Sequence, residues 1–117
     1  MLKKEVLRNN KDFSTIFNKG KSNVTRNIVV FYKKNNLEYN RVAFIASKKV
    51  GNSVKRNKAR RLMKEVYRNY KNDLLNGYDI IFIARNNILM AKYNYLLKDI
   101  KKVLKKIKLF EGEVIWR

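Results

Sequence analysis

The sequence contains no cysteine, no histidine and no proline, and only nine of its 117 residues are acidic. Without cysteine there is no disulfide framework and no thiolate zinc site, and without histidine there is no imidazole base or nucleophilic triad. The charged N-terminus precedes no apolar run, and no segment approaches the ~20 apolar residues that span a membrane. We therefore expect a cytoplasmic protein that makes no membrane contact.

Basic residues dominate what is present. Lys and Arg number 29 against nine Asp and Glu, which gives a net charge of +20 and favours a polyanionic partner, above all a nucleic acid. Hydrophobic residues make up 45% of the chain, enough for a folded core rather than a disordered basic tail. No repeat, linker or low-complexity block interrupts the sequence, so we predict one domain over residues 1–117.

Helical periodicity begins near the N-terminus. Phe13, Ile16 and Phe17 lie at positions i, i+3 and i+4 and would share one apolar face. Asn10 can cap this helix, and Gly20 suits a residue in the left-handed conformation that ends it. The sequence therefore predicts a short first helix with one hydrophobic side.

Strand patterns follow this helix. The segments 26–33 and 41–47 are rich in β-branched and aromatic residues, and we expect them to pair as an antiparallel hairpin. Residues 21–24 are a candidate for a short additional strand. The segment 79–84 is almost continuously apolar, which predicts an interior strand covered on both faces. Apolar residues at helical spacing over 93–107, with lysines between them, predict a long C-terminal helix.

A second helix is predicted after a basic loop. Asn52 or Ser53 can cap it, and one apolar arc would pack on the sheet while the opposite side is cationic. The stretch 48–64 has no acidic residue, a concentration that a solvated face without a ligand explains less well than a surface that binds nucleic acid. The candidate nucleic-acid-binding residues are Lys48, Lys49, Asn52, Lys55, Arg56, Asn57, Arg60, Arg61, Lys64 and Arg68.

The same stretch carries a resemblance to a known family. Residues 47–64 resemble the arginine-rich signature, called RNR, of the protein subunit of bacterial ribonuclease P, and the likeness extends over roughly residues 2–109. The matching positions are Arg56-Asn57, Arg60-Arg61, Asp12-Phe13, Ile16-Phe17, Gly20, Arg41-Val42 and the segment 80–85.

The resemblance implies a fold. It is an α+β, αβββαβα sandwich with a four-stranded sheet, like that of the second domain of ribosomal protein S5. In this fold the basic helix joins two parallel strands by a left-handed crossover, against the usual right-handed rule. Periodicity in the sequence does not itself indicate this topology.

The resemblance also implies a function. The protein would bind the catalytic ribonuclease P RNA through the basic helix and the 5′ leader of precursor tRNA through a cleft, with no obligate protein partner. The RNA would hold the catalytic Mg²⁺ ions, and the protein would have no active site and no metal site of its own. The cleft residues would be Phe13, Phe17, Phe31 and Arg26, where aromatic faces can stack on unpaired bases.

Several alternatives stay open at this point. The spacing of Phe17 suits a buried core residue as well as a cleft residue. A structural, ribosomal-type RNA-binding protein would have the same size and charge. A helix-turn-helix DNA-binding protein would need a helix directly before the basic helix, where the sequence predicts a strand and a loop. An amphipathic membrane binder fits only the C-terminal helix.

Overall fold

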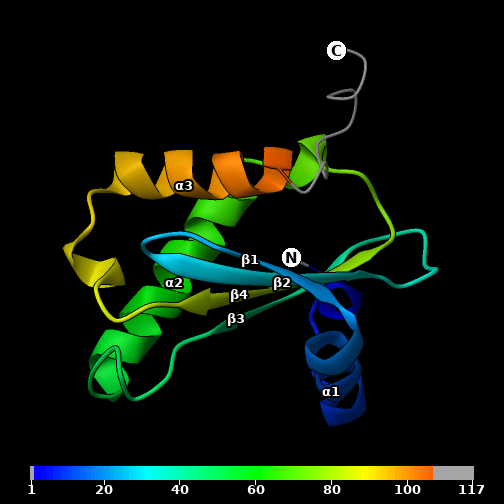
Figure 1. The fold of residues 1–117 in the computed structure, drawn as a ribbon, viewed down its shortest axis with the longest axis horizontal. Coiled ribbons are helices and arrows are strands. Elements are labelled where there is room, and N and C mark those ends of the chain that lie inside the picture. Colours follow the sequence, from blue (N-terminus) through cyan, green and yellow to red (C-terminus); the bar gives the residue numbers. More distant parts are fainter. Residues whose placement is uncertain (1, 107–117) are drawn as a thin grey trace.

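The computed structural model describes residues 2–106 as three helices around one four-stranded sheet (Figure 1). The Ile107 end of the predicted last helix and the tail 110–117 lie outside the described residues. None of the described helices is long and apolar enough to cross a membrane. The elements are η1 (Lys3–Glu5), α1 (Asn10–Lys19), β1 (Lys21–Val24), β2 (Ile28–Lys34), β3 (Arg41–Ile45), α2 (Ser53–Arg68), η2 (Lys71–Asp73), β4 (Tyr78–Ala84), η3 (Ile88–Met90) and α3 (Tyr93–Lys106).

The strand order of the sheet is β1-β2-β4-β3. Strand β2 pairs antiparallel with both β1 and β4, and β3 pairs in parallel with β4. The candidate strand at 21–24 is confirmed as β1. The predicted hairpin is wrong, because β4 lies between β2 and β3 and takes the hydrogen bonds that the two would have exchanged. Strand β4 is buried along most of its length, as an interior strand should be.

Helix α2 provides the crossover between the parallel strands β3 and β4. In Figure 1 both strands run toward the left, β4 lies above β3, and α2 returns behind the sheet. This path is left-handed, which confirms the unusual topology and departs from the rule for such units. The described residues thus form the expected α+β sandwich.

The two faces of the sheet are covered differently. Helices α2 and α3 cover one face, and alternate side chains of the strands, such as Ile28, Val42 and Phe82, point into this larger core. Helix α1 covers part of the other face, where Ile16 packs with Ile81 in a much smaller cluster. The period of two in the strands therefore divides the hydrophobic residues between a sealed side and a partly open side.

The caps of the helices follow the predictions only in part. The side chain of Asn52 accepts a hydrogen bond from the backbone N–H of Lys55 at 3.0 Å, so of the two predicted candidates it is Asn52 and not Ser53 that caps α2. For α1 the cap is Asn9 rather than Asn10, since it is the Asn9 side chain that accepts from Lys11 at 2.8 Å. The cap of α1 therefore lies one residue before the predicted position.

Gly20 does not have the predicted left-handed conformation. Its φ of −78° and ψ of 176° are those of extended backbone. Glycine is required there by close approach, because a Cβ would lie 2.5 Å from the carbonyl oxygen of Ile16 and 2.9 Å from that of Tyr32. The residue thus lets the end of α1 lie directly against β2.

Candidate nucleic-acid interface

The basic surface of α2 is built by the amphipathic pattern of the helix. Ala59, Met63 and Val66 are buried against the sheet, so the intervening cationic residues remain on the outer side. Gly51, with a φ of 147°, provides the turn from the β3 loop into the helix. Of the candidate RNA-binding residues, Arg56, Arg60 and Lys64 are half-buried, and the exposed ones are Lys48, Lys49, Asn52, Lys55, Asn57, Arg61 and Arg68.

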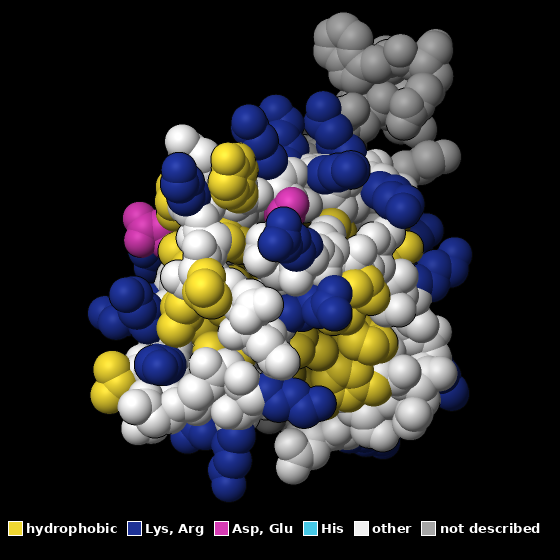
Figure 2. All heavy atoms as spheres, turned by 60° about the vertical axis from the view of Figure 1, so that its left-hand side comes forward, with side chains coloured by type: hydrophobic (Ala, Val, Ile, Leu, Met, Phe, Trp, Pro, Cys, Tyr) yellow, Lys and Arg dark blue, Asp and Glu magenta, His cyan; other side chains and the backbone are white. Residues whose placement is uncertain are grey.

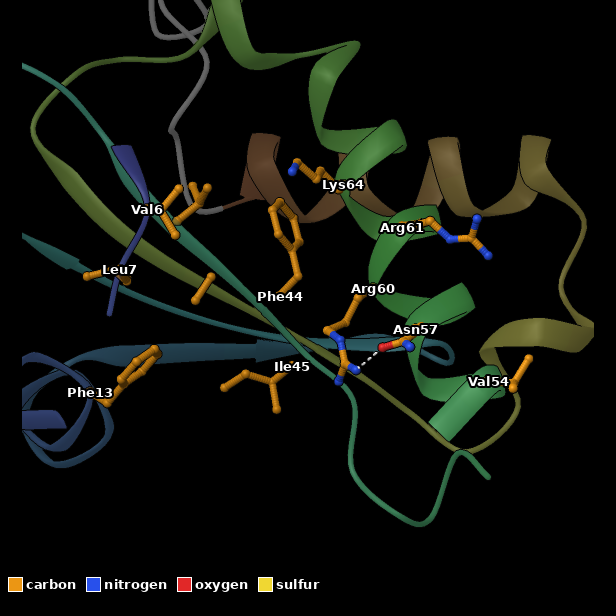
Figure 3. A pocket seen from close by; sticks show the side chains of 12 residues that line it. Val6, Leu7, Phe13, Phe44, Ile45, Val54, Asn57, Arg60, Arg61 and Lys64 are labelled. Atoms are coloured by element: carbon orange, nitrogen blue, oxygen red, sulfur yellow. Dashed lines mark hydrogen bonds between the residues drawn. The ribbon is translucent and has the colours of Figure 1, made fainter. Parts of the chain in front are cut away.

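A groove of about 760 Å³ lies between this side of α2 and the edge strand β3 (Figure 3). One wall consists of the α2 residues Asn57, Arg60, Arg61 and Lys64, and an Arg60 N–H donates a hydrogen bond to the Asn57 side-chain oxygen. Figure 3 shows Lys64 directed toward β3, whereas Arg61 points away from it. The polar wall is thus partly held in place by contacts within the helix.

The floor and far wall of the groove are apolar. They are formed by Phe44 and Ile45 of β3, by Val6 and Leu7 of the N-terminal segment, and by Phe13 of α1. The N-terminal segment is fixed there by a hydrogen bond from the Leu7 N–H to the carbonyl oxygen of Val42 at 2.9 Å. A strand of nucleic acid in this groove would meet cations on one side and hydrophobic surface on the other. Of this apolar half the sequence identified only Phe13, because Phe44 and Ile45 have the ordinary appearance of strand residues and no motif marks Val6 and Leu7.

Three of the four predicted cleft residues lie together. The ring centroids of Phe13 and Phe17 are 6.4 Å apart in a stacked arrangement, and those of Phe17 and Phe31 are 5.0 Å apart, edge to face. Phe17 is 41% exposed, whereas its neighbour Ile16 is buried and occupies the core. Phe17 therefore lies outside the core, on the open side of α1, and its place in a leader-binding cleft stays a prediction. Because Phe13 also lines the groove beside α2, the aromatic cluster and the basic helix share one continuous surface.

Arg26 lies elsewhere. It belongs to the turn between β1 and β2 and lines a second groove, with residues of η3 and α3 such as Met90 and Tyr95. No contact recorded among residues 2–106 joins its side chain to the three phenylalanines. The cleft prediction for Arg26 thus has no geometric support.

A network of charged residues holds α1 against the sheet. The guanidinium of Arg41 donates to Asp79 at 2.8 and 2.7 Å and to Asp12 of α1 at 3.2 Å, and Asn35 donates to Asp79 at 2.9 Å. The hydrogen bonds to Asp79 raise the pKa of Arg41, and the nearby carboxylate charges add to this effect. The sequence did not predict the network, because its members are dispersed along the chain.

The surface of the molecule is strongly cationic. Figure 2 shows hydrophobic side chains gathered in a hollow on one face, with Lys and Arg side chains beside it and few acidic side chains in view. The residues that the structure describes contain no group of three or more acidic side chains that could hold a metal ion. This combination of clustered cations and accessible apolar surface is typical of proteins that bind single-stranded nucleic acids.

Comparison with known proteins adds an independent observation. The family model described as Ribonuclease P matches residues 1–108 of the chain. The chain belongs to this family. The ribonuclease P protein component of Alkaliphilus metalliredigens is 41% identical over 103 residues, which cover 88% of this chain and 93% of the relative. That of Clostridium botulinum strain Loch Maree is 41% identical over 106 residues, covering 90% and 96%.

Solved structures of the ribonuclease P family agree with this fold. The ribonuclease P protein of Staphylococcus aureus matches with a TM-score of 0.82 and 33% identity, over 92% of this chain and 98% of that one. The protein from Thermotoga maritima matches with a TM-score of 0.78 and 30% identity, over 87% and 96%. Helix α2 is preceded by a strand and a loop rather than by a helix, so it is not the reader helix of a helix-turn-helix protein.

Proposed function

We propose that this protein, as the protein component of ribonuclease P, binds the catalytic RNA through α2 and the 5′ leader of precursor tRNA through the aromatic cluster. The observation that carries the proposal is the shared groove, in which the cations of α2 and the ring of Phe13 line a single space. Two RNA molecules bound on these adjoining surfaces would be brought together by one small protein. A charge of +20 reduces the repulsion between them.

The cleft surface suits an unpaired leader. Phe17 and Phe31 present aromatic rings that are only partly covered, and stacking of a base on such a ring is worth ~1–3 kcal/mol without requiring a particular base. Leaders of different tRNA precursors differ in sequence, so a surface that reads the ring and the backbone rather than base edges would accept all of them.

The reactive chemistry belongs to the RNA in this proposal. The chain has no histidine and no cysteine, and the two carboxylates that come together, Asp12 and Asp79, are both held by Arg41. The described residues therefore offer no fitting set of Mg²⁺ ligands. We assign the catalytic Mg²⁺ to the RNA, because Mg²⁺ prefers oxygen ligands such as those of phosphate groups. The protein would act in the cytoplasm by holding the substrate and the catalytic RNA.

Reconstituted cleavage tests the proposal. The ribonuclease P RNA is assayed at low Mg²⁺ with precursor tRNA, with and without the protein, and we expect the protein to increase the cleavage rate. The protein alone should leave precursor tRNA intact. Failure to stimulate the RNA, or cleavage by the protein alone, would contradict the proposal.

Binding measurements test the role of α2. Arg60→Gln removes one phosphate-binding cation from the wall of the groove. The affinity of the variant for the ribonuclease P RNA should fall about tenfold, and the slope of log affinity against log salt should fall by about 1, because one fewer counterion is released on binding. Lys11→Gln, on the exposed surface of α1, is the matched control and should leave both quantities close to those of the wild type.

A further inference from the structure

A second groove, of about 790 Å³, lies on the α3 side of the sheet. It is lined by the β1–β2 turn, by η3 and by the first three turns of α3. Four of its side chains are cations, and they come from the turn, from the residue directly before α3 and from α3 itself: Arg26, Lys92, Lys98 and Lys102. We define these four residues together with Met90 and Tyr95 as the α3 groove.

The α3 groove exposes hydrophobic surface among its cations. Tyr95 is 57% exposed and Met90 is 85% exposed. Two exposed side chains are too few to form a hydrophobic patch of the size that binds another protein. The groove contains one carboxylate, that of Asp99, and this group already accepts a hydrogen bond from the Asn27 side chain at 2.8 Å. An accessible phenol ring in a groove that also contains several cationic side chains is an arrangement suited to an unpaired nucleotide.

The α3 groove adjoins α2 through η3. Ile88 of η3 is fully buried in the core that contains Ala59 of α2, and Figure 1 shows this segment in yellow beside the helix. At ~100° per residue, Lys55 and Lys58 lie on the flank of α2 opposite Arg60. Both lysines are exposed. The cationic surface thus continues around α2 from the first groove toward the second.

The sheet separates the α3 groove from the aromatic cluster. Helix α3 packs on one face with Phe82, whereas Phe13 and Phe31 belong to the other face with α1. A leader strand held by the phenylalanines would therefore have to pass around the sheet to reach Tyr95. An RNA that already lies along α2 has a direct path, because only η3 intervenes.

We propose that the α3 groove binds an unpaired segment of the ribonuclease P RNA. One base stacks on Tyr95, and the phosphates that flank it are neutralised by Lys98, Lys102 and Arg26. This inference rests on the proposed function, since it extends the RNA-binding surface of α2 across η3. It also gives Arg26 a role that the aromatic cluster does not provide.

Two substitutions of Tyr95 test the stacking contact. Tyr95→Ala removes the ring and should weaken the affinity for the ribonuclease P RNA about tenfold, a loss within the range measured for one stacked base. Tyr95→Phe keeps the ring and should bind like the wild type. Leu37→Ala, an exposed apolar residue outside the groove, is the control for loss of exposed surface and should also bind normally. Circular dichroism verifies that each variant is folded.

Charge substitutions test the phosphate contacts. The double variant Lys98→Gln/Lys102→Gln should lower the slope of log affinity against log salt by roughly 1.5–2, because two condensed counterions are no longer released. The charge-matched control Lys11→Gln/Lys19→Gln on α1 should leave the slope unchanged. An equal loss of slope in the two double variants would mean that only net charge matters and would overturn the groove proposal.

The outcomes separate this inference from the proposed function. If Arg60→Gln weakens RNA binding but Tyr95→Ala does not, the α3 groove is not an RNA site and the role of α2 stands. If neither variant weakens binding, the proposed function itself is overturned. A photoreactive phenylalanine at position 95 should crosslink to unpaired nucleotides of the ribonuclease P RNA. Crosslinks to precursor tRNA alone would assign the groove to the substrate and overturn the proposal.

Discussion

The two faces of the sheet differ in how many hydrophobic residues they bury. The face under α2 and α3 contributes to a cluster of eighteen buried residues, whereas the cluster on the face under α1 contains four, among the residues that the structure describes. Phe82 on the first face is completely buried, and Phe17 above the second is 41% exposed. The comparison teaches that stability can be concentrated on one side of a thin domain, which leaves aromatic side chains on the other side available for ligand binding.

The largest effect is expected on the sealed face. Phe82→Ala leaves a cavity beneath the rings of Phe44 and Tyr67, whose centroids lie 5.5 and 5.6 Å from that of Phe82. We expect a loss of about 3–5 kcal/mol in the free energy of unfolding, measured by urea denaturation. A loss below about 1 kcal/mol would show that the two faces do not differ as described.

The next effect concerns the attachment of α1 to the open face. Asp79→Asn removes the carboxylate that pairs with Arg41 at 2.7 Å, and the partly buried guanidinium then keeps only Asp12. We expect a loss of roughly 2–3 kcal/mol in stability, together with weaker leader binding because α1 carries Phe13 and Phe17. Asp73→Asn, an isosteric change at an exposed carboxylate, is the control and should alter neither measurement.

Alkaline titration gives a pH-dependent test of the sealed face. Burial raises the pKa of Tyr67 from 10.0 to about 12. Because the pKa is raised in the folded state, the associated stability is fully present below pH 10 and is lost as the pH rises to about 12. The loss is on the order of 2 kcal/mol. Comparison of unfolding curves for the wild type and Tyr67→Phe isolates this contribution, since the variant keeps every other ionisable group.

The smallest effect on stability is expected at the open face. Phe17→Ala also removes a phenyl ring, but the Phe17 side chain is already 41% exposed, so the stability should fall much less than for Phe82→Ala, by less than about 1 kcal/mol. Affinity for precursor tRNA should instead fall about tenfold, while affinity for leaderless tRNA stays constant. Equal losses with the two substrates would remove Phe17 from the leader site.

The sequence predicted local structure better than long-range pairing. The helices, the Asn52 cap and the interior character of β4 follow from periodicity and side-chain chemistry over short windows. The hairpin prediction was wrong because propensity identifies strands without identifying their partners, and β4 comes more than thirty residues after β3. Gly20 was misread for a similar reason, since its requirement comes from Tyr32 across the α1–β2 contact.

For the candidate site too, the sequence predicted the features that lie within one helix but not the contacts between distant segments. The basic face of α2 is visible in the sequence because the apolar and charged residues of one helix alternate at a fixed period. Periodicity could not distinguish core from cleft for Phe17, because Ile16 and Phe17 are neighbours on one arc of α1 and only packing decides which is buried. The network of Arg41, Asp12 and Asp79 left no local signal, since the three residues belong to three different elements.

The position of β4 inside the sheet has a consequence for synthesis on the ribosome. Strands β1 to β3 and all of α2 emerge before the strand that joins them, so the inner edges of β2 and β3 stay unpaired until about residue 84 has been made. The nascent polypeptide cannot complete its sheet segment by segment from the N-terminus. Closure comes late in translation, and a chain truncated before Tyr78 would lack the only strand among the described residues that connects its two halves.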